Sequence, residues 1–369
     1  MKQNTWIIDA HQDLAWNMLT FGRDYNLAAG ETRRQERTGQ TPARNGDTLL
    51  GWPDYQRGQV ALIFATLFAA PARRSLGDWD AQSYRDPAGA RQRYHAQLDA
   101  YHRLVEEHPK HFHLVQNRAD LQATLASWSR VATQAGNPQH PVGLVILMEG
   151  AEAITDPAEV ETWYRRGVRI IGPAWAGTRF CGGTREPGPL TNAGYALLES
   201  MAQYNLALDL SHMDAQAARQ ALDSYPGTVI ASHANAAALL KGFESNRFLP
   251  DDVIASLVER DGVIGIVPFN KFLQPGWTIS AGRQAVTLDE VVAQIDYICQ
   301  LAGDACHVGL GTDFDGGFGL QSVPAEIDTI ADLRLLIPLL AQKGYTETDI
   351  AAVMGKNWAR ILERVLTES

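Results

Sequence analysis

Short apolar runs recur along the chain, and longer amphipathic stretches separate them. Eight of these runs are β-branched or apolar on both faces, which is typical of parallel strands that helices cover on either side. We predict strands at Trp6–Ile8, Val60–Phe68, Val142–Met148, Val168–Ile171, Ala207–Leu210, Val229–Ala231, Val263–Val267 and Val308–Gly311.

The stretches between the apolar runs contain residues that begin and continue helices. Pro250 is followed by two acids, and proline suits a first helical turn while acids suit the positive end of the helix dipole. We therefore predict a helix that opens at residues 250–252. The other predicted helices are Asp86–His108, Asn117–Ala135, Asp156–Arg166, Asn192–Tyr204, Asp214–Tyr225, Thr287–Leu301, Ala325–Gln342 and Thr346–Val365.

Eight strand–helix units in series, without a Pro/Gly-rich linker in the middle, favour an α/β fold of the (β/α)8 TIM type. We expect residues 1–369 to form this single barrel domain, with a doubly wound open sheet as the alternative. Two βα connections are long, Gly22–Gly58 and Trp175–Pro189. The first is polar and favours a solvated loop, although unusually long loops are often functional and a lid over the barrel mouth is the alternative.

Composition excludes several classes of protein. The formal net charge is −10, whereas non-specific nucleic-acid binding requires a basic face. The three cysteines form no C-x-x-C pair, which argues against a zinc ribbon or a disulfide framework. The first residues lack the apolar stretch of a signal peptide, and no run is long enough to span a bilayer. We therefore expect a soluble, cytoplasmic protein that acts on neither nucleic acid nor membrane.

Two potential metal ligands follow the first predicted strand. His11 and Asp13 are two residues apart, so in extended chain their side chains point to the same side. Imidazole and carboxylate are both suitable zinc ligands, so the pair could bind one metal ion. A His-x-Asp sequence alone is weak evidence, because it often marks an ordinary strand end.

Other polar residues follow other strands. Glu149 directly follows the third apolar run, where a carboxylate is costly to bury unless it is paired, and it could bridge two metal ions. Glu152 is a competitor that lies further from the strand. His212 and His233 follow the fifth and sixth strands at equivalent positions, which is harder to attribute to packing than a single histidine.

A further acid lies at the tip of the last predicted strand. Asp313 follows a glycine-containing turn, whereas Asp315 is better explained as a loop or capping acid. In a β/α barrel the C-terminal ends of the strands converge on one mouth, where active sites form. We therefore predict one site that contains His11, Asp13, Glu149, His212, His233 and Asp313.

With these motifs the sequence resembles the membrane (renal) dipeptidase family of the amidohydrolase superfamily. The resemblance runs from Asp9–Leu14 to Gly355–Arg360, and it is the ordered set of motifs that is specific. It implies a metallodipeptidase with two zinc ions, although the ligands would also accept other divalent metals.

The resemblance also implies individual roles. His11, Asp13 and Glu149 would bind one zinc ion, and Glu149, His212 and His233 the second. Asp313 would act as general base and acid. The family uses an arginine after the second histidine to bind the substrate carboxylate, and Arg247 matches that motif, although the segment between them is a few residues longer than usual.

One position departs from the family pattern. After the fourth strand the family typically has a histidine that contacts the scissile carbonyl and its oxyanion, and Trp175 stands there in this sequence. An indole has one N–H donor and cannot become cationic. Loss of an oxyanion donor can cost roughly 10²–10³ in rate. Either Arg179 or Arg185 replaces the donor, or the substrate differs, or Trp175 simply packs at the barrel mouth.

Two alternative functions remain open. The same metal centre could cleave a lactone, an ester or another amide, which Trp175 favours, whereas Arg247 favours a peptide with a free carboxylate. The second alternative is a non-catalytic metal-binding protein, which the intact ligand set opposes. The expected partner is a small peptide-like substrate. Members of the family are often homodimers, although no segment here indicates an interface.

Overall fold

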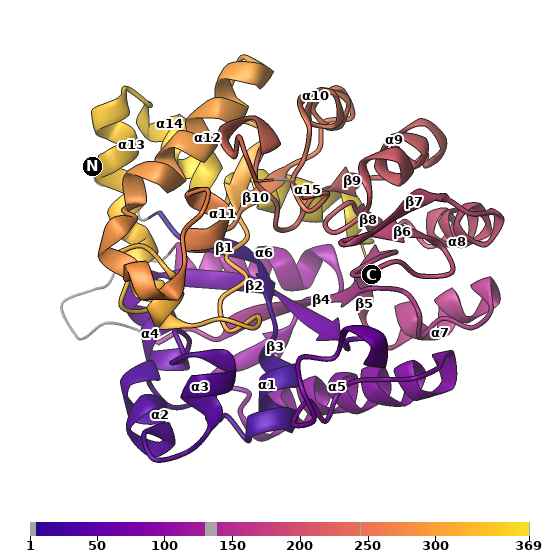
Figure 1. The fold of residues 1–369 in the computed structure, drawn as a ribbon, viewed down its shortest axis with the longest axis horizontal. Helices are drawn as coiled ribbons and strands as arrows, with labels where there is room; N and C mark the ends of the chain where they lie inside the picture. Colours follow the sequence, from indigo (N-terminus) through magenta and orange to yellow (C-terminus); the bar gives the residue numbers. More distant parts are fainter. Residues whose placement is uncertain (1–4, 130–138, 244, 369) are drawn as a thin grey trace.

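The computed structural model of the chain describes residues 5–129, 139–243 and 245–368. All eight predicted strands are present and lie side by side in one sheet, with ends that differ from the predictions by up to four residues (Figure 1). They are β1 (Ile7–Gln12), β2 (Val60–Phe68), β4 (Val142–Glu149), β5 (Val168–Gly172), β8 (Ala207–Asp209), β9 (Val229–Ile230), β10 (Ile264–Ile266) and β11 (Val308–Leu310).

The sheet curves into a nearly closed parallel barrel. Its strand order is β10-β11-β1-β2-β4-β5-β8-β9, so the first strand pairs with both the second and the last strand of the barrel. An isolated parallel bridge between Ala231 and Ile264 joins β9 to β10. Because this bridge joins the two ends of the sheet, the fold is the predicted barrel and not the open sheet.

The barrel interior is narrow where three chain segments meet at the Ser232 carbonyl oxygen. A Cβ atom built on Gly265 would lie 1.9 Å from this oxygen, and one built on Gly311 would lie 1.8 Å from it. Both contacts are far shorter than van der Waals distances, so a side chain at either position would push the strands apart. The two glycines therefore allow β10 and β11 to approach the segment that carries His233.

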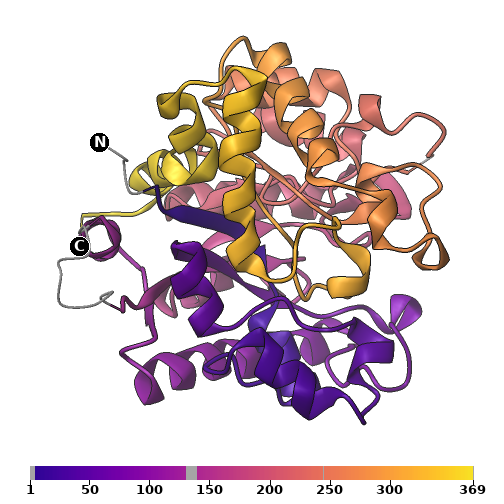
Figure 2. The same ribbon diagram turned by 90° about the vertical axis from the view of Figure 1, so that its left-hand side faces the viewer.

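Helices surround the strands. In Figure 1 α7, α8, α9 and α10 follow one another along the right-hand edge, and Figure 2 shows β1 between the N-terminal part of the chain, below, and the C-terminal part, above. The helices that were predicted are α5 (Pro87–Glu107), α6 (Arg118–Trp128), α7 (Val160–Arg165), α8 (Asn192–Gln203), α9 (Ala215–Ser224), α10 (Asp251–Glu259), α12 (Leu288–Ala302), α13 (Leu336–Lys343), α14 (Glu347–Ala351) and α15 (Asn357–Val365).

Several helix boundaries differ from the predictions. The predicted helix Ala325–Gln342 begins only at a 3₁₀ turn, Ile330–Leu335, which leads into α13. The predicted helix Thr346–Val365 is interrupted by a π-helical turn, Ala352–Lys356. The last part of the predicted helix Asn117–Ala135 lies outside the described residues from position 130 onwards.

Three strands were not predicted. β3 (Phe112–Leu114) adds to β4 beside the barrel, and β6 (Cys181–Gly183) and β7 (Glu186–Leu190) form an antiparallel hairpin. The hairpin occupies the second long connection, where glycines and prolines favour a loop. Short helices outside the 22–58 connection were not predicted either: α1 (Leu14–Phe21) follows β1, and α11 (Asn270–Leu273) follows β10.

The 22–58 connection is folded rather than a plain solvated loop. It contains α2 (Ala29–Glu36), α3 (Thr41–Asn45) and α4 (Trp52–Gly58), and Asp315 fastens it to the loop after β11. The buried Asp315 carboxylate accepts hydrogen bonds from the Tyr25 hydroxyl at 2.9 Å and the Leu49 backbone N–H at 3.0 Å. It also lies 3.0 Å from Nη1 of the buried Arg23. Asp315 is therefore an anchor for this connection and not a helix cap.

Among the described residues, no helix is both long and apolar enough to cross a membrane.

Candidate metal centre

The six predicted site residues lie at one rim of the barrel, because each follows or ends a parallel strand. His11 is in β1 and Asp13 follows it, Glu149 ends β4, and Asp313 lies three residues after β11. His212 and His233 each lie three residues after the strand that precedes them. The structure brings all six into three overlapping groups that could each hold a metal ion.

The first group consists of His11, Asp13 and Glu149, which are all buried. The Nε2 atom of His11 lies 3.5 Å from Oε2 of Glu149 and 4.0 Å from Oδ1 of Asp13. The hydroxyl of Thr66, in β2, donates a hydrogen bond to the same Asp13 oxygen and so fixes the carboxylate.

The second group consists of Glu149, His212 and His233. Oε1 of Glu149 lies 2.9 Å from Nε2 of His212 and 3.4 Å from Nε2 of His233. The two histidine Nε2 atoms are themselves 2.9 Å apart. Glu149 thus belongs to both groups, and each of its oxygens faces a different one.

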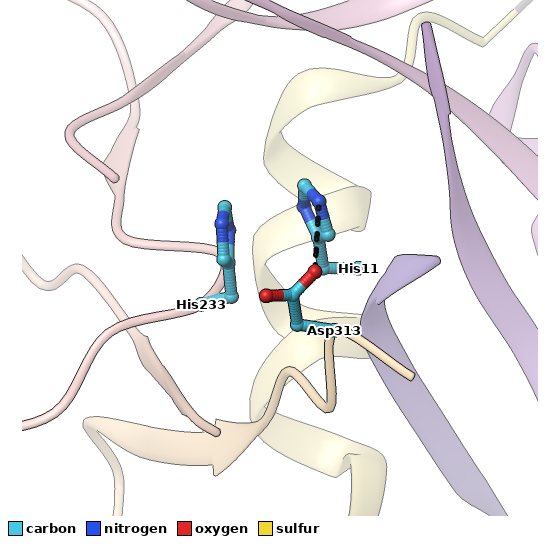
Figure 3. A group of neighbouring side chains, drawn as sticks. All are labelled: His11, His233 and Asp313. Carbon is cyan, nitrogen blue, oxygen red and sulfur yellow. Dashed lines mark ion pairs between the residues drawn. The ribbon is translucent and has the colours of Figure 1, made fainter. Parts of the chain in front are cut away.

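Asp313 completes the site from the side of β11. Its Oδ1 lies 3.8 Å from Nε2 of His11, and the ring of His11 stacks on that of His233 at a centroid distance of 3.6 Å (Figure 3). The backbones of Asp313 and His212 have positive φ angles of 57° and 67°. Residues other than glycine rarely adopt this conformation, and it is concentrated at functional sites.

The donor set fits divalent metal ions. The buried Nε2 atom of His11 has no hydrogen-bond partner among the described residues, although it faces three carboxylates. A buried polar atom without a partner is costly unless something else satisfies it. Nitrogen and carboxylate oxygen ligands suit zinc, and a cation between them would also offset the repulsion among the buried acids.

Hydrogen bonds from outside the groups hold the imidazoles. The Thr184 hydroxyl, between β6 and β7, lies 2.9 Å from Nδ1 of His212. The Ser232 hydroxyl lies 2.8 Å from Nδ1 of His233 and donates to the buried carboxylate of Asp209 at 2.5 Å. Contacts of this kind orient metal-binding histidines so that the other ring nitrogen faces the metal.

For His11 and Glu149, burial and the charges of neighbouring side chains have opposite effects on the pKa. Burial lowers the pKa of His11, but the carboxylates of Glu149, Asp13 and Asp313 together outweigh burial and raise this pKa to about 10. Burial raises the pKa of Glu149, but His11 and His212 outweigh it and hold the pKa well below its usual value. Glu149 and His11 thus favour each other's charged forms, and a metal ion bound there would displace the proton of His11, because an imidazole must be neutral to bind metal.

The remaining residues are shifted mainly by burial. Burial lowers the pKa of His212 to about 4, and the positive charge of Arg247 lowers it further. Burial likewise lowers the pKa of His233, which keeps both rings neutral and able to bind metal. Burial, opposed by His11, raises the pKa of Asp313 well above its usual value.

A cavity of about 880 Å³ opens above these groups. Asp13, Glu149, His212 and Asp313 are part of its lining, and so are Trp175, Arg185 and Arg247. Arg179 is not brought to this cavity: it lines a separate one beside the β6–β7 hairpin. Glu152, the competitor of Glu149, lies in that separate cavity as well.

Sequence reasoning missed the residues that support the ligands. Thr66 lies within an apolar strand, and Asp209 precedes Leu210-Ser211-His212 without a motif that indicates its partner. A usable signal exists for Ser232, because a serine precedes both histidines in the sequence. The phenylalanines that line the cavity were missed too, since an isolated aromatic residue in a sequence more often indicates packing.

Comparisons with known proteins identify the family of the chain. The model of the family described as membrane dipeptidase (peptidase family M19) matches residues 1–369. A Klebsiella pneumoniae protein described as an uncharacterized protein in pqqA 5′ region is 30% identical over 236 residues, 61% of this chain and 82% of the relative. The dipeptidase aclJ of Aspergillus oryzae is 26% identical over 364 residues, 96% of this chain and 77% of the relative.

A solved structure supports the fold independently. A metallo peptidase from Rhodobacter sphaeroides, liganded with a phosphinate mimic of the dipeptide L-Ala-D-Ala, is 23% identical to this chain and superposes with a TM-score of 0.76. The match covers 98% of this chain and 99% of that protein. The likeness therefore extends over the whole barrel and is not confined to the metal-binding motifs.

Proposed function

The chain belongs to the membrane dipeptidase family, peptidase family M19, and on that premise we propose that it hydrolyses dipeptides with a free carboxylate by means of two zinc ions. His11, Asp13 and Glu149 would hold one ion, and Glu149, His212 and His233 the other. Other divalent metals could take the place of zinc, because the same ligands accept several of them.

The observation that carries this proposal is the position of Glu149 between the two groups. Its Oε2 faces His11 at 3.5 Å, whereas its Oε1 faces His212 at 2.9 Å. A carboxylate that presents one oxygen to each of two ligand groups is suited to bridge two cations. The side chains of Glu149, His11 and His212 are all buried. This burial and the two-sided position of Glu149 favour a pair of metal ions over a single ion.

Bound metal ions of this kind activate a water molecule near neutral pH and polarise the substrate carbonyl. Asp313 is placed to transfer protons, because its carboxylate lies beside both groups and lines the cavity. In its ionised form this carboxylate can accept a proton from the attacking water. The same carboxyl group can then donate the proton to the departing amine.

Arg247 is proposed to bind the C-terminal carboxylate of the substrate. The residue is buried and lines the cavity, and its Nη2 donates one hydrogen bond to the backbone oxygen of His233 at 2.7 Å. This contact fixes the guanidinium next to a proposed metal ligand. A guanidinium has further N–H groups that can bind a carboxylate through two parallel hydrogen bonds.

The two glutamates near the end of β4 allow a matched test of the metal sites. Glu149→Gln should reduce bound zinc, measured by elemental analysis, from about two ions per chain to one or fewer, because an amide is a poor metal ligand. Glu152→Gln should leave both the metal content and the hydrolysis of alanyl-alanine unchanged. Equal metal content in the two variants would contradict the proposed ligand set.

Asp313→Asn tests the catalytic assignment separately. We expect kcat for alanyl-alanine to fall by roughly 10²–10⁴ with the zinc content unchanged, because an amide cannot accept the proton. Turnover within a few-fold of the parent would show that another group is the base. Hydrolysis of a lactone but of no dipeptide by the parent enzyme would overturn the peptidase assignment.

A further inference from the structure

Two aromatic walls line the cavity above the metal-binding residues. We call Trp16, Phe68 and Trp175 the tryptophan wall, and Phe269, Phe272 and Phe318 the phenylalanine wall. All six side chains belong to the cavity lining. Three of these rings, Trp175, Phe269 and Phe272, remain partly exposed to the cavity. Exposed aromatic surface within a cavity is stabilised when something apolar covers it.

The tryptophan wall stands on the side of β2 and β5. The rings of Phe68 and Trp175 are 5.0 Å apart, and Trp16 packs on Phe68 at 6.4 Å. Trp16 and Phe68 are buried, while Trp175 remains partly exposed to the cavity and reaches to 6.1 Å from the ring of His212. The indole therefore lies against the proposed second metal site and presents an apolar face there.

The phenylalanine wall follows β10 and β11. Phe269 stacks on Phe318 at 4.3 Å and contacts Phe272 at 4.9 Å. The Asn235 side chain donates to the backbone oxygen of Phe272 at 2.9 Å, which holds this turn in place. The guanidinium of Arg247 lies 5.6 Å from the centre of the Phe272 ring, so the proposed carboxylate site adjoins this wall.

The size of the cavity favours large side chains. Ligand pockets typically enclose roughly 300–1,000 Å³, and this cavity, at about 880 Å³, lies near the upper end. A dipeptide of two small residues would leave the partly exposed rings of Trp175, Phe269 and Phe272 in contact with water. Two aromatic side chains would cover them, and burial of one aromatic side chain favours binding by a factor of about 10–100.

The position of Arg247 orients the substrate. If Arg247 binds the C-terminal carboxylate, the C-terminal side chain lies beside Phe272 and the phenylalanine wall. The scissile carbonyl then lies over the metal ligands, and the N-terminal side chain lies beyond them, against Trp175.

We propose that this enzyme selects dipeptides with an aromatic side chain at both positions, with the tryptophan wall binding the N-terminal and the phenylalanine wall the C-terminal side chain. This selectivity rests on the proposed dipeptidase function and refines it. It also assigns a role to Trp175, which serves as a surface for substrate binding.

The test compares kcat/KM of the zinc-loaded enzyme for alanyl-alanine, phenylalanyl-alanine, alanyl-phenylalanine and glutamyl-alanine. We expect each phenylalanine substitution to raise kcat/KM about tenfold or more over alanyl-alanine. Glutamyl-alanine is included because Arg185 and Lys271 also line the cavity. If it were the best substrate, these cations and not the aromatic walls would determine selectivity, and the proposal would be wrong.

Two variants assign each wall to one position. Trp175→Leu should lower the preference for phenylalanyl-alanine over alanyl-alanine about tenfold and affect the preference for alanyl-phenylalanine much less. Phe272→Leu should do the reverse. Tyr195→Ala is the control, because it removes an aromatic ring that is 40% exposed on α8. It should leave kcat/KM for both phenylalanine-containing dipeptides, relative to alanyl-alanine, unchanged.

The outcomes separate the two proposals. If alanyl-alanine is hydrolysed as fast as the aromatic dipeptides, the aromatic selectivity is wrong and the dipeptidase function stands. If no dipeptide is hydrolysed by zinc-loaded enzyme, the dipeptidase function itself is wrong. Because the comparison of substrates uses the parent protein, a variant that fails to fold does not prevent either result.

Discussion

At the scale of single residues, the hydroxyl of Ser232 connects the two proposed metal sites. It lies 2.8 Å from Nδ1 of His233 and 3.5 Å from Nδ1 of His11, and it donates to Asp209. Asp209 in turn accepts hydrogen bonds from the backbone N–H groups of Ser211 and Ser232. One buried carboxylate thus holds the segments that carry both histidines of the second group.

Replacement of Ser232 by alanine should weaken metal binding. Removal of a hydrogen bond to the outer nitrogen of a metal-binding histidine typically costs 10–100-fold in affinity, so we expect a loss of about that size. Competition with a chromophoric chelator measures the zinc affinity directly. Ser224→Ala, which removes a surface hydroxyl of α9, is the control. An unchanged zinc affinity would mean that Ser232 only fills space.

The six residues of the proposed site could be found from the sequence because each stands at a strand end, where the barrel rule places it. Arg179 could not be placed, since the sequence does not show that a hairpin turns it toward a separate cavity. The roles of Thr66 and Asp209 could not be predicted either, because they depend on partners that are distant in the chain. Residue types near strand ends therefore identify the ligands, whereas hydrogen-bond partners that are distant in the sequence can be found only from the structure.

At the scale of elements, the 22–58 connection depends on a buried ion pair. Arg23 lies beside Asp315, and Tyr25 and Thr48 donate to the same carboxylate. Asp315 belongs to the loop that also carries Asp313. The connection is therefore linked to the site through this loop, although none of its residues lines the cavity, and its role as a lid over the mouth stays a prediction.

Asp315→Ala should destabilise the protein by about 3–5 kcal/mol, because it leaves the buried guanidinium of Arg23 without this partner. Urea denaturation monitored by tryptophan fluorescence measures the change in the free energy of unfolding. Asp223→Ala changes an exposed acid of α9 and should alter the free energy of unfolding by less than about 0.5 kcal/mol. A similarly small change for Asp315→Ala would show that the anchor is dispensable.

The strands of the barrel were predictable because their residues are buried on both faces, as β2 and β4 show along their full length. The β6–β7 hairpin was not predictable, because its glycines and prolines resemble a loop and its contact with Gln220 of α9 involves a residue distant in the chain. The helices of the 22–58 connection were missed because they are short and lack a periodic apolar face. The segments before and between them are held by the distant Asp315.

At the scale of the whole molecule, the proposed metal ligands come from four separate strand ends, those of β1, β4, β8 and β9. Metal bound only by the folded chain stabilises it by mass action, by about 4 kcal/mol at a free metal concentration 1,000 times the dissociation constant. Because the ligands come from four strands, bound metal is expected to stabilise the whole barrel.

Removal of metal with a chelator should therefore lower the melting temperature by several degrees, and added zinc should restore it. Differential scanning calorimetry measures both changes. Glu149→Gln should melt near the temperature of the chelated parent and respond less to zinc, whereas Glu152→Gln should behave like the parent. A melting temperature independent of zinc would argue that the ligand groups do not bind metal in the folded protein.

The order of the strands also has a consequence for biosynthesis. β1, β2 and β4 are consecutive neighbours in the sheet, and together with the residues next to them they supply His11, Asp13 and Glu149. These three residues are synthesised before His212 and His233, because they precede them in the sequence. The ligands of the first cation are therefore all synthesised before the ligand set of the second is complete, which requires residue 233. Because domains generally fold as units, we expect neither cation to be bound until the barrel has formed.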